Sequence, residues 1–90
     1  MFKRKKLKKI EARIEIVERD IEFFETLSRE VSEMKMKLFR IAKSENDEEV
    51  ENQIVELEED LHNLNCYLLG NVVRLQNECD ALEHERWKLI

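Results

Sequence analysis

The 90-residue sequence contains no proline and only one glycine, the residue types that most often end helices and form turns. A chain that is 41% charged and rich in Leu, Ile and Val has the composition of long helices or of a coiled coil. The shortage of glycine also excludes a glycine-rich phosphate-binding loop. Ninety residues are enough for one small domain. The sequence therefore predicts a single all-α domain.

Long apolar runs are also missing, and the cysteines are few. No run of eighteen apolar residues exists, so we expect no membrane-spanning helix. The basic start of the chain is not followed by the apolar segment of a signal peptide, so we expect no secretion. Cys66 and Cys79 lie about 20 Å apart on one helix, which is too far for a disulfide. These features predict a cytoplasmic protein with reduced thiols.

The first half of the chain contains a heptad pattern, in which apolar residues recur at intervals of three and four. Two consecutive steps of three, at 21, 24 and 27, indicate a stammer, which locally overwinds a supercoil. The apolar positions are Leu7, Ile10, Ile14, Val17, Ile21, Phe24, Leu27, Val31, Met34, Leu38 and Ile41.

The second half contains a similar pattern. Two consecutive steps of four, at 64, 68 and 72, indicate a stutter, which locally unwinds a supercoil. The only glycine, Gly70, lies inside this stutter. The apolar positions are Val50, Ile54, Leu57, Leu61, Leu64, Leu68, Val72, Leu75, Cys79, Leu82 and Leu89.

The segment between the two patterns has no apolar residue from Lys43 to Glu49, and Ser44 or Asn46 can cap a new helix. We therefore expect a basic N-terminal segment at 1–9, a helix at 4–43, a turn at 44–46 and a helix at 47–88. The two long helices form an antiparallel helical hairpin in which residue i faces residue 91 minus i. The seam within the chain would contain Ile14, Ile21 and Phe24 opposite Leu64, Leu68, Leu75 and Leu82.

Two helices alone leave one side of their seam exposed to water. Apolar residues outside the seam gather at one level of the hairpin, which predicts a second interface and a homodimer or higher oligomer, most simply a four-helix bundle. Trp87 is interpreted either as a lid on the core over Phe2 and Leu7 or as an anchor for a partner. The candidate interface residues are Ile16, Phe23, Cys66, Leu69, Gly70, Val73 and Trp87.

Gly70 allows two interpretations, because glycine inside a helix costs about 1 kcal/mol relative to alanine. In the first, the helix is continuous and Gly70 lets another helix or a phenylalanine ring approach the backbone. In the second, Gly70 or Asn71 ends the helix in the left-handed conformation. The second interpretation gives a three-helix bundle with a break at Gly70 and Asn71.

The sequence contains no constellation typical of catalysis. His62 and Cys66 have a spacing that can bind a metal, but a site would need two more ligands, and a surface histidine beside a thiol is the simpler interpretation. The carboxylates lie among other charges and lack a pocket that would tune them as acid and base. We therefore expect no enzyme activity, no cofactor, no metal site and no small-molecule substrate.

Two charged segments suggest partners. Residues 45–60 contain nine acids and no base, and a hairpin would place them beside Lys35, Lys37, Arg40 and Lys43. The leading hypothesis is a protein-interaction or oligomerisation module. The alternatives are a small acidic regulator or inhibitor that occupies a basic site, as a nucleic-acid mimic could, and a nucleic-acid-binding protein. The basic segment could bind nucleic acid or an anionic membrane surface, or be a solvated tail. Its candidate polyanion-binding residues are Lys3, Arg4, Lys5, Lys6, Lys8 and Lys9.

Overall fold

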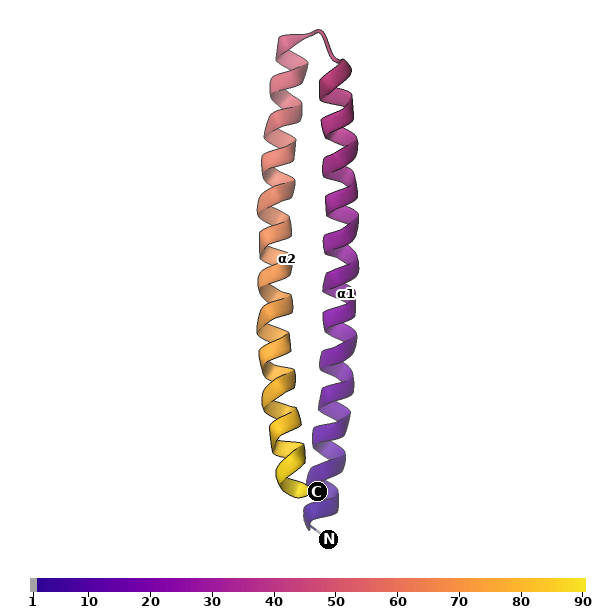
Figure 1. The fold of residues 1–90 in the computed structure, drawn as a ribbon, viewed down its shortest axis with the longest axis vertical. Helices are drawn as coiled ribbons and strands as arrows, with labels where there is room; N and C mark the ends of the chain where they lie inside the picture. Colours follow the sequence, from indigo (N-terminus) through magenta and orange to yellow (C-terminus); the bar gives the residue numbers. More distant parts are fainter. Residues whose placement is uncertain (1) are drawn as a thin grey trace.

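The computed structural model describes residues 2–90 and consists of two helices, α1 (Phe2–Ser44) and α2 (Glu48–Leu89). They pack antiparallel into a rod of 70 × 14 × 13 Å, with both chain ends at one end of the rod and the loop at the other (Figure 1). The predicted all-α hairpin is confirmed. Because α2 runs without interruption through Gly70 and Asn71, the three-helix alternative is wrong.

The loop between the helices is held by short-range hydrogen bonds. Ser44 ends α1, and its hydroxyl donates to the Ile41 carbonyl at 3.1 Å. A Glu45 carboxylate oxygen accepts from the Asn46 and Asp47 amides, both at 3.0 Å. Asp47 caps α2, since its carboxylate accepts from the Glu49 amide at 2.9 Å. The helix cap is therefore Asp47, not Ser44 or Asn46, and it satisfies one of the free amides at the helix start.

An unbroken heptad pattern lines the side of α1 that packs on α2, and the predicted stammer is absent. Met34 and Ile41, which were expected in the seam, are about half exposed. Lys35 and Ala42 occupy the seam in their place, and Ser28 is buried next to the half-buried Leu27. The buried or half-buried residues that follow the pattern are Leu7, Ile10, Ile14, Val17, Ile21, Phe24, Ser28, Val31, Lys35, Leu38 and Ala42.

The same regularity holds for α2, where the predicted stutter is absent. Leu57 and Leu64 were expected in the seam but are about half exposed, so the predicted packing of Leu64 inside the hairpin is wrong. Glu58 and Asn65 take their positions. The seam residues of α2 are Ile54, Glu58, Leu61, Asn65, Leu68, Val72, Leu75, Cys79, Leu82, Arg86 and Leu89.

Side-chain contacts between the helices define their register. The Arg13 guanidinium donates twice to one Glu78 carboxylate oxygen, at 3.0 and 2.7 Å, and the Ser28 hydroxyl donates to the Asn65 side-chain oxygen. The residue numbers of these pairs add to 91 and 93, in agreement with the predicted register. Over residues 2–90, neither helix combines the length and apolar character needed to cross a membrane.

Candidate protein-interaction surface

A polar layer interrupts the seam near the middle of the rod. Ser28 is buried and donates to Asn65, whose amide nitrogen donates to the Ser32 hydroxyl at 3.5 Å. One helical repeat nearer the loop, the Lys35 ammonium lies 3.2 Å from a ring nitrogen of His62. Polar groups in a seam are costly unless they are hydrogen-bonded, and when satisfied they can specify one register.

Apolar side chains are displaced from the seam to one flank of the hairpin. Each of them immediately precedes a seam residue, as Leu64 precedes Asn65, so all lie on the same side as the Arg13–Glu78 ion pair. Apart from the half-buried Leu27, they are 44 to 67% exposed. We call this surface the leucine flank, formed by Ile16, Phe23, Leu27, Met34, Ile41, Leu57, Leu64 and Tyr67.

A second group of exposed apolar residues lies on the opposite flank. Each of these residues immediately follows a seam residue, as Val73 follows Val72, and a step of about 100° per residue turns it to the other side. We call this surface the valine flank, formed by Met36, Phe39, Val55, Cys66, Leu69 and Val73, all of them exposed. The structure thus places the predicted interface residues Ile16 and Phe23 on one flank and Cys66, Leu69 and Val73 on the other.

Gly70 lies on the outer side of α2, between the exposed Leu69 and the half-buried Asn71. A Cβ atom added to it would meet nothing within 4 Å, so close packing against Phe23 or Phe24 of the same chain is excluded. No residue from 2 to 90 has a positive φ, which also excludes a left-handed cap. Gly70 is an ordinary helical residue on the surface of the chain.

Trp87 was predicted either to cover the core or to anchor a partner, and the core interpretation is wrong. Its side chain is 74% exposed, and Phe2 is 92% exposed. Leu7 and Leu89 are half-buried at this end of the rod. Trp87 follows the seam residue Arg86 and therefore lies on the side of the valine flank, where it is accessible to a partner.

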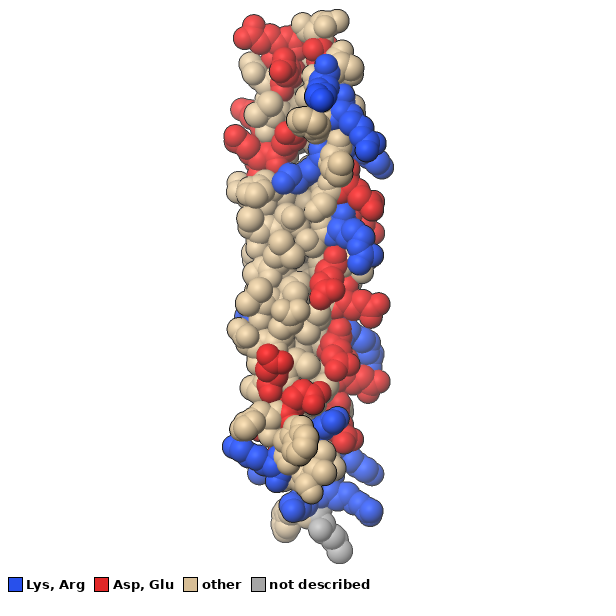
Figure 2. Space-filling view, in the orientation of Figure 1, with Lys and Arg blue, Asp and Glu red and all other residues tan. Residues whose placement is uncertain are grey.

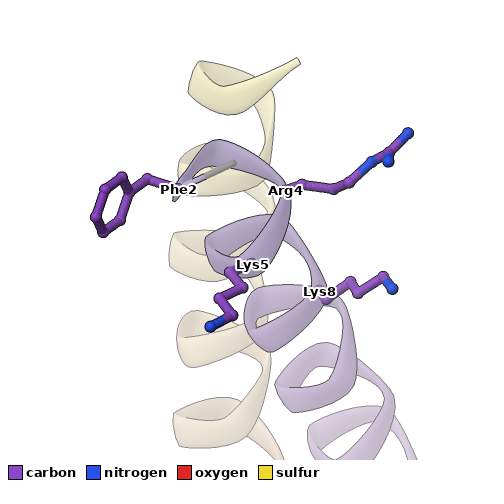
Figure 3. A pocket seen from close by; sticks show the side chains of 4 residues that line it. All are labelled: Phe2, Arg4, Lys5 and Lys8. Carbon is purple, nitrogen blue, oxygen red and sulfur yellow. The ribbon is translucent and has the colours of Figure 1, made fainter.

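The basic N-terminal segment forms the first turns of α1. Its six basic side chains are exposed. In the shallow hollow of about 350 Å³ beside Phe2, Arg4, Lys5 and Lys8, the side chains point away from one another and do not converge on one point (Figure 3). This arrangement offers dispersed positive charge and no enclosed anion site.

Acidic side chains gather over α2 at the loop end of the rod (Figure 2). Over residues 2–90, the ion pairs join Arg13 to Glu78, Arg19 to Glu15 and Arg86 to Glu83. The hairpin places the tract 45–60 beside the helix segment that carries Lys35, Lys37, Arg40 and Lys43, as expected. Among the described residues, however, none of the ion pairs includes a residue of this tract. Glu45 and Asp47 bind backbone amides, and Glu58 lies in the seam. The other acids of the tract are exposed: Glu48, Glu49, Glu51, Glu56, Glu59 and Asp60.

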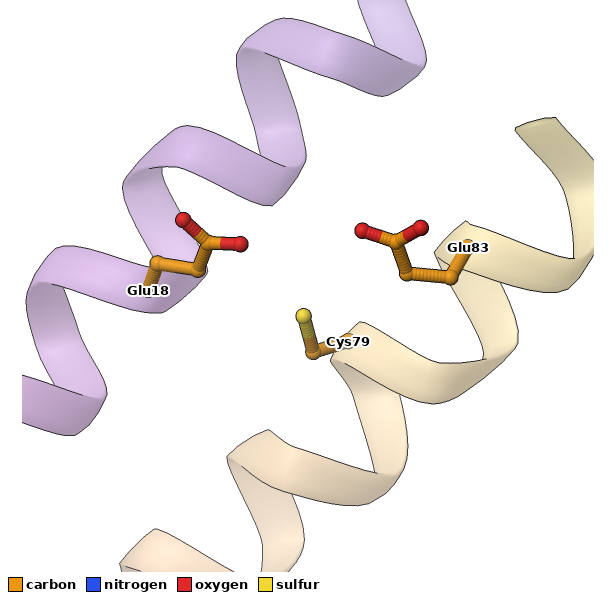
Figure 4. Close-up of side chains that lie close together, drawn as sticks. All are labelled: Glu18, Cys79 and Glu83. Atoms are coloured by element: carbon orange, nitrogen blue, oxygen red, sulfur yellow. The ribbon is translucent and has the colours of Figure 1, made fainter.

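Cys79 lies in the seam beside two carboxylates, Glu18 of α1 and Glu83 of α2 (Figure 4). The thiol sulfur and one oxygen of each carboxylate all lie within 4.8 Å of one another. Burial raises the pKa of the Cys79 thiol, and the negative charges of Glu18 and Glu83 raise it further. The sequence alone does not reveal this cluster, because Glu18 and Cys79 are brought together only by the hairpin. Exposed carboxylates commonly gather without an ion, so the cluster alone does not define a metal site.

The His62–Cys66 pair was interpreted as a surface histidine beside a thiol. The Cys66 sulfur lies 3.7 Å from one ring nitrogen of His62, and the other ring nitrogen contacts the Lys35 ammonium. Both residues are exposed. A lysine ammonium on one ring nitrogen disfavours a cation at the same place, so these contacts fit the surface interpretation.

Comparisons of the chain with protein-family models, with curated proteins and with solved structures find no match.

Proposed function

We propose that this protein is a non-enzymatic helical hairpin that acts by binding another macromolecule, and that its first partner is a second copy of itself. The leucine flank is the binding surface. Two hairpins that cover each other's leucine flanks form a four-helix bundle, in which each helix packs on two neighbours.

The proposal rests on one observation: the polar Asn65 occupies a seam position, while the adjacent Leu64 is exposed. In the loop half of the hairpin, the seam contains Ser28, Lys35 and Asn65, whereas Leu57 and Leu64 are about half exposed. In an isolated hairpin this arrangement lowers stability, because burying apolar area is the main favourable term in folding. The arrangement becomes favourable when another helix pair covers the leucines. Exposed apolar patches of this kind mark interaction sites.

A pair of matched substitutions on α2 tests the proposal. Leu57 and Val55 are two residues apart, are 50% and 44% exposed, and lie on opposite flanks. We expect the wild-type chain and the Val55→Glu variant to have the mass of two or more chains in sedimentation equilibrium at micromolar concentration. The Leu57→Glu variant should have the mass of one chain, because it places a charge inside the interface.

Two outcomes would contradict the proposal. A wild-type chain that sediments as a single chain removes the self-association. Equal loss of mass in both variants would show that the interface is not restricted to the leucine flank. Circular dichroism of each variant serves as the control, since both substitutions lie on exposed positions and should leave the helix content unchanged.

A second candidate function rests on the acidic tract. Because residues 45–60 make no ion pair within the described chain, they could occupy a basic site on a larger protein. Binding of a basic protein such as a histone, measured at low salt and lost when Glu56 and Glu59 are replaced by glutamine, would support this function. Retained binding in that variant would oppose it.

A further inference from the structure

Exposed apolar and basic side chains gather at the end of the rod that holds both chain ends, which we call the terminal end. Phe2, Ile90 and Trp87 are 92, 77 and 74% exposed, more than any other large apolar side chain of residues 2–90. Residues 2–9 and 82–90, which form this end, contain eight basic and two acidic side chains, a net charge of +6. Residues 10–81 contain eight basic and 19 acidic side chains, a net charge of −11. The terminal end is therefore a positively charged tip on a negatively charged rod, as Figure 2 shows for one face.

The basic side chains surround the start of α1 and do not follow one of its faces. Lys3, Arg4, Lys5 and Lys6 are consecutive, and a step of about 100° per residue turns them to every side of the helix. Figure 3 shows Arg4, Lys5 and Lys8 pointing in different directions. A nucleic-acid groove instead holds its basic groups along one path, and a site for a single phosphate makes them converge. A ring of positive charges around an apolar tip fits an extended anionic surface that meets the end of the rod.

We propose that the terminal end binds the surface of a membrane that contains anionic phospholipids, with Phe2, Trp87 and Ile90 inserted among the headgroups. Tryptophan favours the boundary between headgroups and acyl chains, and each basic side chain near an anionic surface strengthens binding by about fivefold. Binding of this kind grows with both the apolar area buried and the charge. The leucine flank takes no part in this contact, so the inference goes beyond the proposed self-association and does not depend on it.

The charge of the rest of the chain determines how the rod meets the surface. The rod is 70 Å long and only 14 Å wide, so lying flat would bring residues 10–81 close to the membrane, and like charges oppose such a contact. Residues 3–9 span about 9 Å of helix, which is close to the screening length of about 8 Å. When the rod stands on its terminal end, the basic side chains therefore lie near the lipid phosphates and the acidic loop lies far from them.

Fluorescence of Trp87, the only tryptophan of the chain, is the first test. Vesicles of equal parts phosphatidylcholine and phosphatidylserine, in about 100 mM sodium chloride, should shift its emission to shorter wavelength and sediment with the protein. Vesicles of phosphatidylcholine alone should do neither. About 500 mM sodium chloride should release most of the bound protein. An unchanged spectrum and no sedimentation with the anionic vesicles would overturn the proposal.

Two pairs of matched variants locate the contact. Phe2→Ala should weaken vesicle binding by at least about tenfold, whereas Phe39→Ala, also at an exposed position but near the loop, should bind as the wild type does. Lys5→Gln with Lys8→Gln should weaken binding by about 25-fold, whereas Lys37→Gln with Arg40→Gln should not weaken it. Unchanged binding of Phe2→Ala overturns the insertion, and equal losses within either pair overturn the assignment to the terminal end. Because all six positions are exposed, circular dichroism should show an unchanged helix content in each variant.

Energy transfer to a labelled lipid decides the orientation. In a Cys66→Ala, Cys79→Ala background, a donor is attached at His84→Cys, near the terminal end, or at Asn46→Cys, in the loop, both at exposed positions. An acceptor on the lipid headgroups should give high transfer from position 84 and low transfer from position 46. High transfer from both positions shows a rod that lies flat and overturns the upright arrangement.

Nucleic acid competes for the same basic side chains. Single-stranded and double-stranded oligonucleotides, at the phosphate concentration of the vesicles, should bind the wild-type chain more weakly than the vesicles do. Tighter binding of either oligonucleotide overturns the membrane proposal in favour of a nucleic-acid partner. None of these outcomes bears on the proposed self-association, which sedimentation equilibrium measures without vesicles.

Discussion

At the scale of single residues, Gly70 is the position where the structure departs most clearly from expectation. A glycine in a helix that touches no neighbour has no packing role within its own chain. Its cost is the conformational freedom that it loses in the helix, which alanine largely avoids.

We therefore expect Gly70→Ala to stabilise the protein by up to about 1 kcal/mol, because the added methyl group meets nothing within 4 Å. Urea denaturation followed by circular dichroism measures the change. The matched control is Ala81→Gly, also at an exposed helical position of α2, which should destabilise by a similar amount. A destabilised Gly70→Ala variant would show that a partner molecule approaches this part of the backbone.

Cys79 is the residue whose ionisation depends on the hairpin. Its pKa is raised in the folded state by burial and by Glu18 and Glu83, so the folded chain holds this proton more tightly than the unfolded chain does. The stability that this contributes is fully present below the ordinary thiol pKa of about 8.5. It is lost as the pH rises through the raised pKa of the folded state.

We expect the wild-type protein to lose more stability between about pH 8 and pH 10.5 than a Cys79→Ala variant does. Denaturant titrations of both proteins at several pH values measure this difference, since every other side chain is the same in the two proteins. In addition, Glu18→Gln should lower the pKa of the thiol and speed its alkylation at pH 8, with Cys66 in the same chain as the internal reference. Equal alkylation rates of Cys79 in wild type and Glu18→Gln would contradict this account.

At the scale of the helices, the polar layer decides how α1 and α2 align. Ser28 and Asn65 hydrogen-bond to each other across the seam, and both sit at positions where the surrounding pattern is apolar. Such a layer contributes less stability than well-packed aliphatic side chains, but it disfavours shifted registers in which the amide would be left without a partner.

Replacing one member of this layer should cost more than replacing both. Asn65→Leu alone leaves the Ser28 hydroxyl buried without its acceptor, which costs about 1–3 kcal/mol. The double variant Ser28→Ala, Asn65→Leu should recover most of this loss. Stabilities from urea denaturation give the coupling between the two positions, and Ser32→Ala, at an exposed position, should change stability by no more than about 0.5 kcal/mol. Additive effects of Ser28 and Asn65 would show that the bond does not contribute.

The helices themselves could be predicted from the sequence, and so could the seam in the terminal half. In the loop half, the pattern placed Val31, Leu38, Ile54 and Leu61 correctly but misplaced Met34, Ile41, Leu57 and Leu64. Near the termini, Ile14, Val17, Leu75 and Leu82 allow one heptad register, so pattern and structure agree. In the loop half, Leu57 and Leu64 immediately precede Glu58 and Asn65, so two registers one residue apart compete. The apolar pattern of the sequence selects Leu57 and Leu64 for the seam. In the folded hairpin, the continuous heptad spacing places Glu58 and Asn65 there.

The candidate surface was only partly visible in the sequence for the same reason. Ile16 and Phe23 stood outside the heptad pattern and were recognised, but Met34, Ile41, Leu57 and Leu64 were assigned to the seam. The sequence signal for this surface is the width of the apolar stripe, because a stripe that spans two adjacent heptad positions can pack against two neighbouring helices. The Glu18–Cys79–Glu83 cluster gave no signal, because it joins residues 61 positions apart.

At the scale of the whole molecule, the basic segment is a separable source of charge. Its six lysine and arginine side chains are exposed, and none takes part in an ion pair of the described chain. The segment therefore adds little to the stability of the hairpin, while it offers a dispersed positive surface to phosphate groups.

Replacing residues 3–6, 8 and 9 with glutamine should change stability by no more than about 0.5 kcal/mol and should abolish retention on heparin at low salt. Thermal denaturation and heparin chromatography at about 50 mM salt measure the two effects. A chain with six exposed acids changed to glutamine, at Glu22, Glu25, Glu30, Glu33, Glu56 and Glu59, should keep or increase its retention. A wild-type chain that flows through heparin at this salt concentration would show that the segment does not bind polyanions.

The placement of both chain ends at one end of the rod has a mechanical consequence. A force that pulls the two termini apart acts first on the half-buried Leu7 and Leu89 near the chain ends, then on the layers of the seam beyond them, and reaches the loop last. The hairpin would open one layer at a time and at low force, because at any moment the force acts on only one layer of packed side chains. A force applied between the loop and the termini instead runs along the axes of the helices and loads their backbone hydrogen bonds in every turn. The rod is thus weak against separation of its ends and strong along its length.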